Sequence, residues 1–65
     1  MPTVTTMANN RVESAEISDE TYIFLRDGAA LRKQDIVWLL RHIAELYGSL
    51  TEATITRYME EKRVL

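Results

Sequence analysis

The strongest helical pattern in the chain lies in residues 33–48, KQDIVWLLRHIAELYG. Its large apolar residues recur at intervals of three and four, which is the spacing of one helix face, and Gly48 ends the pattern. Val37 and Ala44 widen this apolar stripe to about half of the helix circumference. Such a width predicts a central helix that other elements contact on two sides. The stripe itself consists of Ile36, Leu39, Leu40, Ile43, Leu46 and Tyr47.

Trp38 lies off this stripe, on the side of the helix that carries Arg41, His42 and Glu45. Two interpretations stay open for it. In the first, the N-terminal segment or the first helix covers the indole. In the second, Trp38, Arg41 and His42 form an exposed interface for a partner protein, because Trp and Arg contribute strongly to such interfaces. A lone histidine in a chain without cysteine is a poor metal ligand, so we expect no metal site and no cofactor.

A shorter helix is predicted within ISDETYIFLRDG, residues 17–28. Ser18 is a suitable N-cap, and Gly28 supplies a left-handed stop. Asp19 and Glu20 follow the cap, where the helix N-terminus favours negative charge. A helix of about two turns is marginal alone, so its apolar residues must pack on another element.

The last helix has two possible starts. If Ser49 is the N-cap, Glu52 completes a capping box. If Thr51 is the N-cap, Leu50 and Ile55 have the spacing of a hydrophobic staple. Both alternatives place a helix in the same stretch.

The first sixteen residues, MPTVTTMANNRVESAE, show neither a helical period nor sustained alternation of apolar and polar residues. We expect them to form a flexible arm. An alternative is that PTVTT, residues 2–6, pairs as an edge strand in a dimer, because valine and threonine favour strands.

Together these patterns predict an all-α fold, a small three-helix bundle with helices near residues 18–27, 32–47 and 50–63. A disordered arm, residues 1–16, precedes a single helical domain, residues 17–65. The residues expected to pack in the core are Phe24, Leu25, Ile36, Leu39, Leu40, Ile43, Leu46, Ile55, Tyr58 and Met59.

The length of 65 residues limits the stability that this core can provide. A chain of this size buries only about 60% of the surface that its unfolded form exposes. Without cysteine, disulfides cannot compensate, so association with a partner or a second copy is the expected source of further stability. We therefore expect a homodimer.

Composition and charge restrict the function. The net charge of −2 argues against a general nucleic-acid coat protein, which must neutralise many phosphates. No combination of nucleophile and base typical of an enzyme is present, so we expect neither catalysis nor a small-molecule substrate. No apolar run approaches the ~20 residues that span a bilayer, and the N-terminus lacks a secretory signal pattern, so we expect a cytoplasmic protein without membrane contact.

Over about residues 36–65 the chain resembles helix-turn-helix DNA-binding proteins. In that family an Ala in the first helix, a Gly at the turn and a second helix of the form T-I-x-R-Y recur. The matching residues here are Ala44, Gly48, Thr54, Ile55, Arg57 and Tyr58.

The resemblance implies that Ala44 and Ile55 join the two helices and that the second helix faces the major groove. The implied groove-facing residues are Thr51, Glu52, Thr54, Thr56 and Arg57, while Lys62 and Arg63 are expected to add contacts to the DNA backbone. The favoured function is a small dimeric regulator of transcription that binds DNA. The alternative is a protein-interaction module, an adaptor or inhibitor, that uses the wide apolar face of the helix at residues 32–47 together with Trp38 and does not touch nucleic acid.

Overall fold

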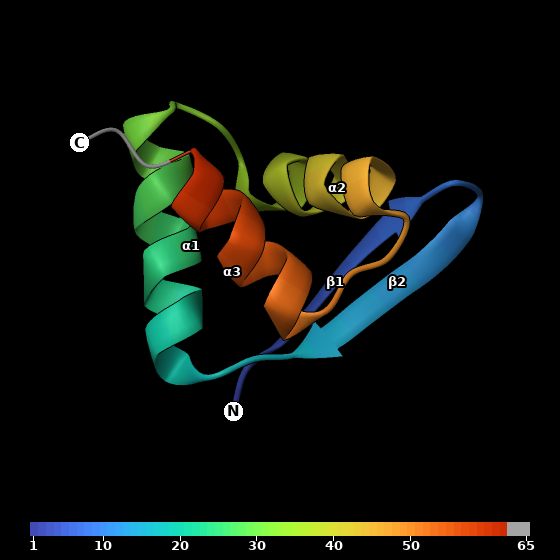
Figure 1. The fold of residues 1–65 in the computed structure, drawn as a ribbon, viewed down its shortest axis with the longest axis horizontal. Helices are drawn as coiled ribbons and strands as arrows, with labels where there is room; N and C mark the ends of the chain where they lie inside the picture. The colour runs from blue at the N-terminus through green and yellow to red at the C-terminus, as the bar shows by residue number, and fades with distance from the viewer. Residues whose placement is uncertain (63–65) are drawn as a thin grey trace.

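An antiparallel hairpin begins the chain, and three helices follow it (Figure 1). The computed structural model describes residues 1–62. The elements in chain order are β1 (Thr3–Ala8), β2 (Arg11–Glu16), α1 (Asp19–Leu31), α2 (Ile36–Tyr47) and α3 (Glu52–Glu61). The fold is therefore α+β, and the prediction of an all-α bundle is wrong.

Asn9 and Asn10 form the two-residue turn of the hairpin, with φ angles of 56° and 63°. Turns of this length match the twist of paired strands when both central residues have positive φ, and asparagine tolerates this better than most residues. The pairing runs from Thr3 opposite Glu16 to Ala8 opposite Arg11. Residues 1–16 are thus not a flexible arm, and the partner strand of β1 lies in the same chain.

One face of β1 packs on α2. The inward residues are Val4, Thr6 and Ala8, which alternate with exposed neighbours. The Thr6 hydroxyl donates a hydrogen bond to the carbonyl oxygen of Val37 at 3.5 Å. A threonine and an alanine take two of the three inward positions, so the alternation is not visible as a hydrophobic pattern in the sequence.

The contacts of α2 explain its wide apolar stripe. This helix lies against β1 and also contacts α1 and α3, while α3 lies beside α1 (Figure 1). Most of the predicted core residues are buried, namely Leu25, Leu39, Leu40, Ile43, Ile55, Tyr58 and Met59. Phe24 and Leu46 are exposed, so the prediction is wrong for these two, and Ile36 is half-buried. Leu46 lies at a margin of the stripe, beyond the part that neighbouring elements cover.

The first helix is longer than predicted. Ser18 caps its start as expected, since its side chain accepts a hydrogen bond from the Thr21 backbone N–H at 3.1 Å. Gly28 does not stop the helix, which continues to Leu31. A Cβ at Gly28 would overlap the terminal methyl group of Met59, so this glycine allows α3 to approach α1 closely.

The connection between α2 and α3 follows the prediction more closely. Gly48 ends α2 in the left-handed conformation, with φ 78°. Of the two possible N-caps of α3, the structure uses Thr51, and both Leu50 and Ile55 are buried. Among residues 1–62, no helix is long and apolar enough to cross a membrane.

Candidate nucleic-acid interface and neighbouring sites

The pair formed by α2 and α3 contains the residues on which the resemblance to helix-turn-helix proteins was based. Ala44 and Ile55 are both buried in the core shared by the two helices, and Gly48 directs the chain from one helix into the next. On α3, Ala53 and Arg57 are exposed and Thr56 is half-buried. These three positions form a solvent-facing stripe of short side chains with one guanidinium group.

Two of the predicted DNA-contacting residues serve a local structural role. The Thr51 hydroxyl accepts a hydrogen bond from the Thr54 backbone N–H at 3.1 Å. The Thr54 hydroxyl in turn accepts one from the Thr51 backbone N–H at 2.9 Å. This reciprocal capping box fixes the direction in which α3 starts. Thr51 and Thr54 therefore position the helix rather than offer free hydroxyl groups.

Arg57 is exposed and paired within its own helix. Its Nε donates to Glu61 Oε1 at 3.0 Å, and this hydrogen bond is the main reason why the pKa of Arg57 lies above its ordinary value. The Tyr47 hydroxyl donates to Glu61 Oε2 at 3.4 Å. The pair is exposed, so solvent screens it and another anion can compete for the guanidinium.

Glu52 does not face the same way as Arg57. Its Oε2 accepts a hydrogen bond from the Ser18 backbone N–H at 2.7 Å, which joins the start of α3 to the start of α1. This hydrogen bond is the main cause that lowers the pKa of Glu52 below its ordinary value. Glu52, which the resemblance implied would face a DNA groove, makes this contact to α1 in the structure.

The low pKa of Glu52 gives a pH-dependent contribution to stability. A carboxyl group whose pKa is lower in the folded state stabilises the fold at pH values above its ordinary pKa, and this contribution disappears as the pH falls through the folded pKa. We expect Glu52→Gln to unfold more easily than the original chain at neutral pH, with a difference that shrinks on acidification. Urea denaturation of both chains across the acid range measures this difference. A difference that stays constant with pH would show that the Glu52 charge has no such role.

An aromatic cluster joins α2 to α3. The rings of Trp38 and His42 are stacked, with centroids 5.2 Å apart and an interplanar angle of 10°. His42 also meets Tyr58 edge to face at 5.6 Å and 78°, and Lys62 Nζ lies 5.9 Å from the centre of the Tyr58 ring. These contacts fix the orientation of Trp38 on the outside of the helix pair.

The outer face of α2 remains largely open around this cluster. Trp38 is 49% exposed, so neither the hairpin nor α1 covers it fully. Val37 and Leu46 of α2 are each 57% exposed, and Arg41 pairs with Glu45 at 3.3 Å. The three residues predicted as a protein interface, Trp38, Arg41 and His42, thus lie close together on one surface.

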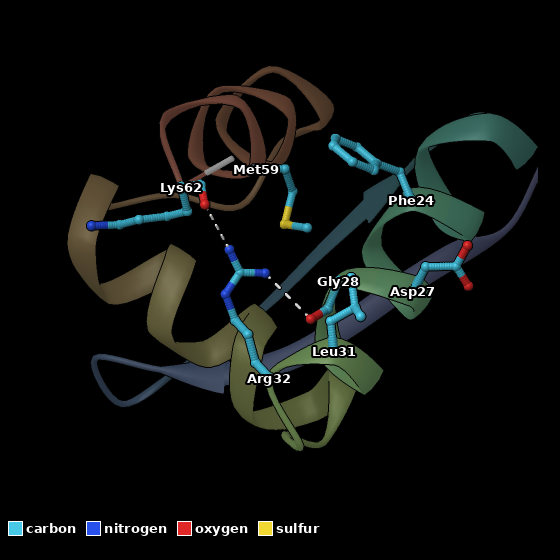
Figure 2. A pocket seen from close by; sticks show the side chains of 7 residues that line it. All are labelled: Phe24, Asp27, Gly28, Leu31, Arg32, Met59 and Lys62. Atoms are coloured by element: carbon cyan, nitrogen blue, oxygen red, sulfur yellow. Dashed lines mark hydrogen bonds between the residues drawn. The ribbon is translucent and has the colours of Figure 1, made fainter. Parts of the chain in front are cut away.

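A pocket that the sequence did not reveal lies between α1 and α3 (Figure 2). Its volume is about 370 Å³, and its apolar lining comes from Phe24, Gly28, Leu31 and Met59. The Arg32 guanidinium crosses beside it, with Nη1 donating to the Gly28 carbonyl oxygen at 3.3 Å and Nη2 to the Lys62 carbonyl oxygen at 3.1 Å. A pocket between two helices depends on residues that are far apart in the sequence. No sequence pattern therefore predicts this pocket.

Lys62 is exposed at the end of α3, and Arg63 lies outside the described residues. Within residues 1–62, no group of three or more His, Cys, Asp or Glu side chains is arranged to hold a metal ion. Comparison of the chain with protein-family models, with curated proteins and with solved structures found no match.

Proposed function

We propose that this chain is a DNA-binding module in which α3 contacts the duplex. The observation that supports the proposal most directly is the position of Arg57, exposed on the solvent-facing stripe of α3 beside Ala53 and Thr56. Short side chains let a helix approach the floor of the major groove, and an arginine reaches a phosphate or a guanine edge from there. The capped start of α3 and the Gly48 turn hold this stripe in one orientation.

Binding requires an exchange of partners at Arg57. The guanidinium leaves Glu61 and meets a DNA anion or a guanine edge, which costs little because the original pair is exposed to solvent. Glu60 and Glu61 are both exposed and repel phosphates, so few phosphate contacts form on this helix. We therefore expect modest affinity that falls with salt less steeply than that of strongly basic DNA-binding proteins.

Replacement of Arg57 by alanine tests this proposal. A single arginine contact to a base edge contributes about 1–3 kcal/mol. Its loss should therefore raise the dissociation constant roughly 5- to 150-fold. Amide chemical shifts of the labelled protein, followed during titration with mixed-sequence duplex DNA at low and higher salt, measure the change. The far-ultraviolet circular dichroism of Arg57→Ala should match that of the original chain.

Arg41→Ala is the matched control, because Arg41 is also exposed and also pairs with a glutamate four residues later, but on α2. It should leave DNA affinity nearly unchanged. Equal losses in the two variants would indicate unspecific charge attraction. If DNA causes no amide chemical-shift changes in α3, then α3 is not part of the contact surface.

A second candidate function is carried by the open face of α2. Trp38 is stacked on His42 and yet half-exposed, and it lies on the same helix as the exposed Val37 and Leu46. Rigid, partly exposed aromatic side chains are typical anchors of protein interfaces. In this function the chain is a protein-interaction module, and DNA would leave the shifts of both helices unchanged at low salt.

A further inference from the structure

The outer edge of β2 offers unused backbone hydrogen-bonding groups. Within residues 1–62, β1 is the one strand that pairs with β2, and Figure 1 shows β2 at the margin of the molecule with no helix beyond it. Open strand edges of this kind readily pair with another chain. We propose that a second copy of this chain docks here, with the two β2 strands antiparallel and Ser14 directly opposite the partner's Ser14.

The hydrogen-bonding pattern of the hairpin shows which residues of β2 direct their backbone N–H and C=O groups away from β1. The Ile17 N–H donates to the Pro2 carbonyl oxygen at 2.9 Å, and these two residues continue the pairing register of the hairpin. Hydrogen-bonded and non-hydrogen-bonded pairs alternate along an antiparallel ladder. It follows that residues 11, 13 and 15 use their N–H and C=O groups toward β1. The groups of Val12, Ser14 and Glu16 point to the open edge.

The side chains leave this edge accessible. Val12 is 67% exposed, and Ser14 and Glu16 are also exposed. On β1, the partner of Val12 is Met7, which is 64% exposed. Val12 and Ser14 are uncharged and β2 contains no proline, while the charged residues of this strand are Arg11, Glu13 and Glu16.

Charge and hydrogen-bond phase select one symmetric register. In an antiparallel sheet, residues directly opposite each other have their side chains on the same face. A two-fold axis that relates the two β2 strands must therefore pass between one residue and the same residue of the partner. Axes at Glu13 or Glu16 would set two carboxylates directly opposite each other, which is destabilising. Axes at Arg11, Val12 or Ala15 give only short ladders, because β2 extends only from Arg11 to Glu16.

An axis at Ser14 avoids both problems. Ser14 then lies opposite the partner's Ser14, and on each side of the axis Val12 of one copy lies opposite Glu16 of the other. All three residues whose backbone groups point to the open edge can therefore form hydrogen bonds with the partner strand. Across the four strands, the central row on the exposed face consists of Thr5 and Ser14 from each copy, and rows of hydroxyl side chains are favourable cross-strand neighbours. No like charges stand opposite each other in this register.

A second copy also fits the needs of the fold. A two-stranded sheet is only marginally stable. Here it contributes Val4, Thr6 and Ala8 of β1 to the interior, and Ala15 of β2 packs against the core while partly buried. Pairing of two hairpins gives a four-stranded sheet in which β2 becomes an inner strand. The helices of each copy stay attached through their own β1, so the outer face of α2 and the stripe of α3 are not used by this contact.

Charged substitutions at Ser14, the residue at the two-fold axis, test the proposed dimer. Ser14→Lys and Ser14→Glu each place like charges opposite each other, so sedimentation equilibrium from micromolar to millimolar concentration should show a shift from dimer toward monomer mass for each variant alone. An equimolar mixture of the two variants should restore the dimer. Thr5→Lys is the matched control, because Thr5 lies opposite Ser14 on the same face but on the other strand, and it should dimerise like the original chain.

Amide hydrogen exchange of the original chain gives a second readout at residue level. Protection of the Val12, Ser14 and Glu16 amides should rise with protein concentration, while the Glu13 and Ala15 amides should be protected at every concentration. A chain that is monomeric up to millimolar concentration would overturn the inference. So would a dimer that both Ser14 variants keep unchanged, which would place the contact elsewhere. All measurements are made without DNA, so they are independent of the proposed role of α3.

Discussion

Leu40→Ala is expected to lower the free energy of unfolding by about 2–5 kcal/mol. Leu40 is 2% exposed and lies on the central helix, so its removal leaves a cavity that the surrounding elements fill only in part. Domains of this length have a total stability of roughly 3–10 kcal/mol at ~0.05–0.15 kcal/mol per residue. The loss should therefore be a large part of the total stability, and urea denaturation followed by circular dichroism measures it.

Leu46→Ala is the control for this prediction, because it makes the same chemical change on the same helix at a position that is 57% exposed. Its effect should stay below about 1 kcal/mol, as is usual for surface substitutions. Losses of similar size in both variants would contradict the central position of Leu40 in the core.

Gly48→Ala is expected to lower the free energy of unfolding by about 1–2 kcal/mol, for a reason that involves no side-chain contact. Gly48 has a φ of 78°, and nothing lies within 4 Å of the place where a Cβ would be. The cost is therefore that of the left-handed backbone for a residue with a side chain. Thermal and urea unfolding of the variant measure it.

Gly48→Asn separates this backbone effect from other consequences of losing glycine. Asparagine adds a larger side chain but tolerates positive φ, so it should retain more stability than alanine. If alanine were as good as asparagine, the left-handed conformation at the end of α2 would not be a requirement of the turn.

The parts of the fold that could be predicted depend on large apolar side chains. The stripe of α2 is visible because leucine and isoleucine recur over several turns, and the caps Ser18 and Gly48 act within a few residues of their own helix. The hairpin was missed because its inward residues are small or polar. Its local signals are the strand preference of residues 2–6 and the pair Asn9 and Asn10, which suits a two-residue turn.

The two glycines differ in whether neighbouring residues determine their structural role. The sequence predicts a helix stop at both glycines, which is confirmed for Gly48 and wrong for Gly28. The role of Gly28 depends on Met59, thirty-one residues later in the chain, so no neighbouring residue reveals it. The candidate DNA surface has the same limit, because the capping role of Thr54 could be anticipated only after Thr51 was known to start the helix.

The hydrogen bond from Ser18 to Glu52 has a consequence for the order in which the helices become stable. In a complete capping box, the third helical residue accepts the hydrogen bond of the N-cap backbone N–H, but in α1 that position is Thr21, and Glu52 of α3 accepts it instead. The beginning of α1 is therefore finished by a residue that arrives thirty-four positions later. A fragment that ends before α3 should have a frayed first turn in α1, and the complete chain should gain that turn and the docking of α3 in a single cooperative step.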